Sequence, residues 1–122
     1  MKHVNMPEAK ATFDETDTLY EAHGTSDSVV LVADEEMHPI NAWAKLVNSD
    51  YIPETCPRCG VNVDDEPDLV MVGAHVLKYK KIENIKKGEP CYIIPLCNRC
   101  NSTSFPKGFK LHRTVNALEV LF

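Results

Sequence analysis

Apolar residues in the first half of the chain gather in two short stretches. The run at 28–33, Ser-Val-Val-Leu-Val-Ala, is rich in β-branched residues and is typical of a buried strand. In the stretch 39–48, Ile40, Trp43 and Val47 recur at helical spacing behind a proline that suits a first helical turn. The pattern predicts a strand and then a helix, and both have an apolar face that needs a partner surface.

The second half carries two more runs of strand type, at 69–76 and 91–96. The stretch between them, 78–88, is rich in lysine, and we expect it to form an exposed hairpin tip or basic loop. A short helix is expected directly after the second run, and Pro106 must end it soon. A final extended segment completes the pattern.

The size and composition of the chain fit one globular domain. With 122 residues, of which 43% are hydrophobic and 25% charged, it can bury one modest core. No apolar run approaches the ~18 residues of a membrane span, and the first residues lack the apolar centre of a signal peptide. We therefore expect no membrane association, a cytoplasmic location and reduced cysteines.

The five residues at 118–122, Leu-Glu-Val-Leu-Phe, match the start of the 3C-type protease site that is used to remove purification tags. We interpret them as a cloning remnant and leave them out of the functional argument. The alternative is a native apolar strand.

Charge divides the chain into two unlike halves. Residues 1–68 hold 15 acidic and 4 basic side chains, a net charge of −11, whereas residues 69–122 hold 3 acidic and 9 basic ones, a net charge of +6. The basic half favours contact with phosphates. The acidic half is either a solvated surface or a cover for a basic partner.

Two Cys-x-x-Cys pairs, 37 residues apart, are the strongest chemical signal: Cys56, Cys59, Cys97 and Cys100. Four thiolates satisfy one tetrahedral zinc ion with no position left open, which predicts a structural site. Arg58 and Arg99, inside the two pairs, can offset its negative charge. The alternative is two separate redox pairs. The fifth cysteine, Cys91, lies in an apolar run and is expected to be a buried thiol.

Three segments together resemble the HNH endonuclease superfamily. They are Cys-Pro-Arg-Cys-Gly at 56–60, Val-Gly-Ala-His-Val at 72–76 and Tyr-Ile-Ile-Pro-Leu-Cys-Asn-Arg-Cys-Asn at 92–101. The resemblance spans roughly residues 54–105. It implies a small treble-clef zinc domain of α+β class, in which one cysteine knuckle leads into a β-hairpin and a second knuckle opens a short helix.

This resemblance implies a division of the chain. Residues 1–53 would be an acidic strand–helix region packed on the zinc module, and residues 54–117 would be the module itself. The apolar run at 28–33 and the helical stripe at 39–48 support the packing, because so short a segment cannot bury them alone.

The resemblance also implies catalytic positions. His75 matches the general base that activates water, and Asn101 matches a residue that helps to hold a catalytic divalent ion such as Mg²⁺. Two positions depart from the pattern. Ala74 stands where many members have an acidic metal ligand, and Tyr92 stands where an asparagine positions the catalytic loop. The chain therefore looks like a degenerate member.

Each candidate residue has a plain structural alternative. His75 can be a family remnant with a structural hydrogen bond, and Asn101 can cap the short helix. The lysines of the predicted basic loop can grip a phosphate backbone or stay solvated: Lys78, Lys80, Lys81, Lys86 and Lys87.

Two functions follow from these residues. The first is a zinc-stabilised HNH-like binding protein without nuclease activity, which acts on a nucleic acid or on a nucleic-acid-processing protein. By analogy of size and charge, such a protein can be a phage-type inhibitor of host defence. The second is an active, metal-dependent HNH endonuclease that hydrolyses DNA with His75 as base. Ala74 and Tyr92 favour the first.

Overall fold

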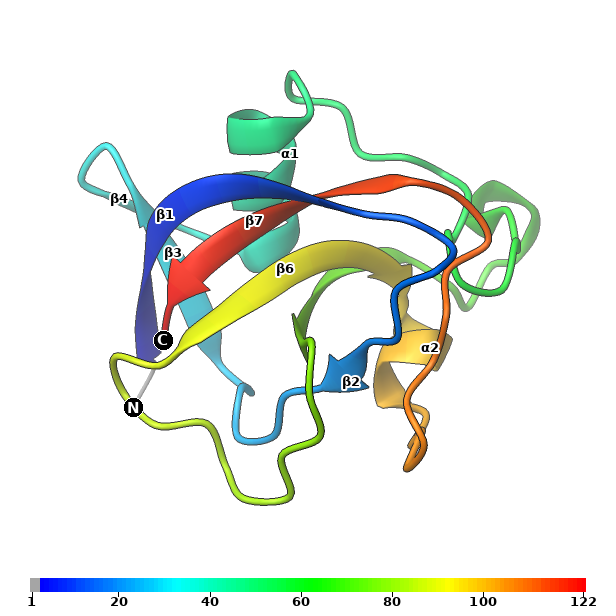
Figure 1. The fold of residues 1–122 in the computed structure, drawn as a ribbon. Coiled ribbons are helices and arrows are strands. Elements are labelled where there is room, and N and C mark those ends of the chain that lie inside the picture. Colours follow the sequence, from blue (N-terminus) through cyan, green and yellow to red (C-terminus); the bar gives the residue numbers. More distant parts are fainter. Residues whose placement is uncertain (1–2) are drawn as a thin grey trace.

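The computed structural model describes residues 3–122 and has an α+β fold, as the sequence predicted (Figure 1). One seven-stranded sheet, in the order β2-β5-β6-β7-β1-β3-β4, carries two short helices. The strands are β1 His3–Phe13, β2 Tyr20–Glu21, β3 Ser28–Val32, β4 Glu35–Met37, β5 Met71–Leu77, β6 Pro90–Cys97 and β7 Val115–Leu121. The helices are α1 Pro39–Val47, α2 Asn98–Ser102 and the single 3-10 turn η1 Val63–Asp65.

The centre of the sheet brings together segments that are far apart in the sequence. β5 and β6 form an antiparallel hairpin in which His75 lies opposite Ile93. β7 joins the other side of β6, and β1 pairs antiparallel with β7 along almost its whole length. β3 then pairs parallel with β1. Strands from both sides of residue 53 thus share a single sheet, in which β5, β6 and β7 lie between β2 and β1.

Alternate side chains of the central strands supply two separate cores, because successive residues of a strand point to opposite faces of a sheet. On β6, Ile94 and Leu96 pack with the cysteine knuckles, whereas Cys91 and Ile93 pack with α1. None of the helices among residues 3–122 is long and apolar enough to cross a membrane.

Helix α1 is held against the sheet by its apolar stripe and by two polar contacts. The indole N–H of Trp43 donates to the backbone oxygen of Asn116 at 2.8 Å, and the Asn116 amide donates back to the oxygen of Val47 at 3.2 Å. The start of α1 sits on Gly73, where a Cβ atom would lie 2.6 Å from the backbone nitrogen of Ile40. Only glycine allows this approach.

The sequence located most elements but missed β1. The strand at 28–32, the helix at 39–47, the hairpin strands and the helix that opens at Asn98 lie close to their predicted positions. β1 carries few buried side chains, since only Asn5 and Phe13 are fully buried along its eleven residues. Its polar sequence therefore shows no alternation of apolar and polar residues that would predict a strand. Its pairing with β3 and β7 holds it in place.

Residues 118–122, which we interpret as a cloning remnant, are part of the sheet. They form the second half of β7 and the residue after it, between β6 and β1. Leu118, Val120 and Phe122 are buried among α1 and the neighbouring strands. Whatever their origin, these residues complete the centre of the sheet.

Candidate metal centre and the adjoining cleft

The two cysteine pairs meet at one point. The sulfur atoms of Cys56, Cys59, Cys97 and Cys100 all lie within 4.8 Å of one another, and those of Cys59 and Cys97 are 3.8 Å apart. A tetrahedron with Zn–S bonds of ~2.3 Å has edges of about 3.8 Å. The group can therefore hold a metal ion, and its all-thiol, closed donor set fits a structural one.

Local backbone geometry orients the thiols of each cysteine pair toward the other pair. The first pair lies in a tight turn closed by the Gly60 N–H, which donates to the oxygen of Cys56 at 2.9 Å; Gly60 has a φ of +79°. In the second pair, Cys97 is the N-cap of α2, and its sulfur accepts the N–H of Cys100 at 3.4 Å. The N–H of Cys97 in turn points at the sulfur of Cys56, at 3.3 Å.

One of the two arginines near the cysteines contacts them. A terminal guanidinium nitrogen of Arg58 lies 3.9 Å from the sulfur of Cys100, and the guanidinium stacks 4.3 Å above the ring of Phe105. This places a fixed positive charge beside a thiolate cluster. In the described part of the chain, the Arg99 guanidinium makes no such contact with the sulfurs.

Burial raises the pKa of Cys56 and of Cys100 in the four-cysteine group, and Cys59 is the thiol of that group whose pKa is lowered. Burial acts to raise the pKa of Cys59, but hydrogen bonds from the Val61 N–H and from the neighbouring thiols outweigh it and lower that pKa to about 7. Burial without such partners raises the pKa of Cys91 to about 12. Cys91 is therefore a buried thiol in the α1 core, as the sequence predicted.

His75 lies on β5, on the face opposite the metal centre, and is 6% exposed. Its Nε2 lies 3.1 Å from Oδ1 of Asn5, whose amide nitrogen donates to the oxygen of Val29 at 3.0 Å. Because the second contact fixes the amide orientation, Oδ1 must accept and Nε2 must carry the proton. Burial, with a smaller effect of His3, lowers the pKa of His75 to about 4, so the ring is neutral at pH 7.

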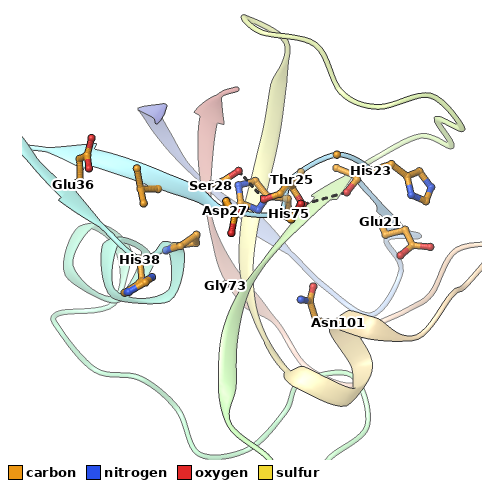
Figure 2. Close-up of a pocket in the computed structure, with 15 residues that line it drawn as sticks. Glu21, His23, Thr25, Asp27, Ser28, Glu36, His38, Gly73, His75 and Asn101 are labelled. Carbon is orange, nitrogen blue, oxygen red and sulfur yellow. Dashed lines mark hydrogen bonds between the residues drawn. The ribbon is translucent and has the colours of Figure 1, made fainter. Parts of the chain in front are cut away.

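A cleft of 1040 Å³ opens above His75 (Figure 2). The loop between β2 and β3, the start of α1, β5 and α2 surround it, and Asn101 of α2 is part of its wall. The two positions that the HNH resemblance singled out thus share one cleft. His23 and His38 line it too, although their polar sequence surroundings gave no sign of it.

The two departures from the HNH pattern lie away from this cleft. Ala74 points to the other face of the sheet and is buried in the core around the cysteines. Tyr92 packs edge-on against Phe13, with ring centres 5.1 Å apart, and the Lys78 ammonium lies 5.1 Å from the centre of the Tyr92 ring.

The lysine-rich loop between β5 and β6 is anchored and yet exposed. Ile85 is buried, and its N–H donates to the oxygen of His23 at 2.9 Å. Lys81 pairs with Glu89 at 3.5 Å. The side chains of Lys80, Lys86 and Lys87 are exposed, as is that of Lys78, which lies over the two aromatic rings.

Comparison of this chain with protein-family models, with curated proteins and with solved structures found no match. The fold and the four-cysteine group are therefore described from the chain's own residues.

Proposed function

We propose that this protein is a zinc-stabilised, HNH-like treble-clef module that binds nucleic acid through the loop 78–87 and does not cleave it. The order of elements supports this assignment: a cysteine turn, then the β5–β6 hairpin, then a second cysteine pair that opens α2. Zinc is the metal that four thiolates in tetrahedral geometry favour.

The observation that carries the binding function is the surface of the loop 78–87. Five lysines and one glutamate occupy ten residues, and exposed apolar side chains stand among them. Tyr79 is 50% exposed and Ile82 is 78% exposed. Cations beside an aromatic face suit a chain of phosphates and bases, since lysine contacts the backbone and the ring stacks on a base.

The absence of cleavage is proposed from the position of His75. Its ring is buried beneath β1, and its proton-bearing nitrogen is engaged with Asn5. Ala74, on the opposite face, supplies no carboxylate at the position that the resemblance gives to a Mg²⁺ ligand, and the acidic residues that line the cleft form no cluster of three potential ligands among the described residues. A base that is misplaced by ~1 Å already loses about 10²-fold in rate.

Binding can be tested by fluorescence anisotropy with labelled single-stranded and duplex oligonucleotides at several salt concentrations. Lys80→Gln/Lys87→Gln should weaken binding of the zinc-loaded protein. It should also reduce the slope of log affinity against log salt by roughly 0.7–0.9 per lysine. Lys10→Gln/Lys45→Gln removes the same charge from exposed positions on β1 and α1 and should leave the slope unchanged.

Equal losses of affinity in the two double variants would show that binding depends only on the net charge of the protein, which would contradict the assignment to this loop. No measurable binding at low salt would defeat the nucleic-acid function altogether. A partner protein that processes nucleic acid would then be the remaining candidate.

An active endonuclease is the second candidate, because His75 and Asn101 line the same cleft. In that case Nδ1 of His75 would take the proton of water and Asn101 would help to hold Mg²⁺. Plasmid incubation over hours with Mg²⁺, Mn²⁺ or Ni²⁺, against EDTA, should show no cutting. Metal-dependent cutting that is lost in His75→Ala would establish the nuclease instead.

A further inference from the structure

A small pocket lies beside the lysine-rich loop, where that loop, β2 and the segment after α2 come together (Figure 1). Its volume is 130 Å³. Aromatic, aliphatic and cationic side chains share its wall: Tyr20, Ile82, Phe105, Pro106, Lys80 and Lys81. Pockets that enclose whole small molecules measure ~300–1,000 Å³, so this one has room for little more than a single planar ring.

Backbone hydrogen bonds tie the walls of this pocket together. The segment after α2 is held by Phe109, which exchanges N–H···O bonds of 2.8 and 2.9 Å with Leu19. The lysine-rich loop is held by Ile85, whose N–H donates to the oxygen of His23 at 2.9 Å. Because all of these bonds end on the stretch 19–23, which contains β2, the walls need no rearrangement to receive a ligand.

Phe105 presents an aromatic surface at a fixed position in the wall. The Arg58 guanidinium stacks over its ring, 4.3 Å from the ring centre, and the Phe109 ring packs against it with centres 5.3 Å apart. The side chain is only partly buried, and the part that these neighbours leave uncovered lines the pocket. Arg58 also contacts the sulfur of Cys100, so the metal centre supports this wall.

The charges around the pocket favour an uncharged ring inside it and a phosphate outside it. Lys80 is exposed and has no ion-pair partner among residues 3–122, so its ammonium can contact a phosphate at the rim. Glu21 also lines the pocket, and its carboxylate repels a phosphate from the interior. A base attached to a sugar–phosphate chain has both of the required parts.

We propose that this pocket binds one unpaired base of a single-stranded nucleic acid, whose phosphates lie along the lysine-rich loop. Because it rests on the proposed nucleic-acid binding, this site narrows that function to strands with unpaired bases. A base can enter only where it is unstacked, and in a duplex both of its faces are covered by neighbouring bases. Stacking on an aromatic wall tolerates any sequence, since every base has a flat face.

The test is fluorescence anisotropy of the zinc-loaded full chain with three labelled oligonucleotides of equal length: a single strand, its duplex, and a strand whose sugars carry no bases. The single strand should bind about 5- to 150-fold more tightly than the abasic strand, which is the range that one stacked base contributes. It should also bind more tightly than the duplex. Equal affinity for the single strand and either of the others would overturn the pocket and leave the loop as a phosphate-binding surface. No binding of any of the three would overturn the proposed function as well.

Variants of the wall separate base binding from phosphate binding. Phe105→Leu removes the ring without a change in charge, and Ser104→Leu adds bulk at an exposed position of the same wall. Each should weaken binding of the single strand and leave both the abasic strand and the salt dependence unchanged. Tyr51→Leu removes a ring that is 54% exposed and lies outside this pocket, and it should bind as the wild type does.

Elemental analysis shows whether Phe105→Leu keeps its zinc, since Arg58 lies between this ring and the cysteines. If zinc is lost, Ser104→Leu alone decides, because it leaves that contact in place. Weaker binding of the abasic strand to the pocket variants, or an equal loss of affinity in Tyr51→Leu, would overturn the proposal.

Discussion

Cys91 and Cys100 show how placement decides the chemistry of one residue type. Burial raises the pKa of both thiols, but Cys91 points into the core beneath α1, outside the four-cysteine group. Cys100 points to the other face, where three more sulfurs and the Arg58 guanidinium surround it. The spacing of the pairs made the grouping predictable, because two cysteines three positions apart meet across one turn whatever the rest of the fold does.

Replacing a cysteine of the group should remove the metal. Cys100→Ser is expected to lose zinc and to unfold the region around the cysteine turn and α2. An open ligand position gives up several kcal/mol of the ~10–16 kcal/mol typical of such sites. Cys91→Ser should keep one equivalent, since its sulfur lies outside the group. Elemental analysis of both proteins checks this, and less than half an equivalent of zinc in the wild type would contradict the metal assignment.

His75 should make stability depend on pH. Its folded pKa of about 4 lies below the ordinary value of 6.5, so the unfolded chain takes up the proton first as the pH falls. The stability linked to the neutral ring is therefore complete above pH 6.5 and is lost progressively towards pH 4, by about 3 kcal/mol.

Urea unfolding at pH 7 and pH 4 of the wild type and of His75→Gln isolates this effect. Glutamine keeps an N–H donor for Asn5 and does not titrate, so the variant should lose about 3 kcal/mol less between the two pH values. Zinc release at low pH affects both proteins and cancels in the comparison. Parallel pH profiles would show that His75 is not the group responsible.

The identity of His75 as a candidate was visible in the sequence, but its environment was not. Asn5, which fixes the tautomer, is 70 residues away, and nothing in the stretch around it suggests a strand. The same holds for His23 and His38, which line one cleft with His75 because of where the loop between β2 and β3 and the start of α1 lie relative to β5. Such contacts follow from sheet order, which local patterns do not encode.

At the scale of elements, a segment was predictable where its own side chains create the pattern. Helix α1 has an apolar stripe, and the β5–β6 hairpin has apolar runs that pack on both faces. β1 has neither, since its stability comes from backbone hydrogen bonds to β3 and β7. A strand that is held mainly by its neighbours cannot be recognised before those neighbours are placed.

The contact between α1 and β5 gives a test at this scale. Gly73→Ala puts a Cβ within 2.7 Å of backbone atoms of Pro39 and Ile40, so α1 must move away from the sheet. We expect a loss of about 1–3 kcal/mol in urea unfolding, together with a change in the fluorescence of Trp43, the only tryptophan.

Gly88→Ala is the control for the glycine substitution itself. Gly88 has a φ of +89°, and a Cβ added there would meet no atom within 4 Å, so alanine costs only about 1–2 kcal/mol of backbone strain. The Trp43 spectrum should stay unchanged. An unchanged spectrum in Gly73→Ala as well would mean that α1 does not rest on this glycine as described.

At the scale of the whole molecule, β7 joins the two halves of the sheet. It has β6 on one side and β1 on the other, so the sheet has no continuous path without it. Deleting residues 118–122 removes three buried side chains, each worth about 1.5–3 kcal/mol, from a protein whose total stability is expected to be ~5–15 kcal/mol.

We therefore expect the deletion variant to be unfolded or insoluble even with zinc present. The double variant Glu119→Gln/Leu121→Thr changes the partly exposed side chains of the same strand and should remain folded. Dispersion of amide signals in an NMR spectrum distinguishes the two states. A folded deletion variant would show that the sheet closes without this segment.

The position of β7 also sets an order of events during synthesis. β1 is synthesised before the other strands of this sheet, yet its longest pairing is with residues 115–121, more than a hundred positions later. Until those residues emerge, the first strand has only β3 as a partner, and the nascent chain exposes the edge that β7 will cover. The time between the synthesis of β1 and that of β7 is therefore the period in which this edge can pair with another chain.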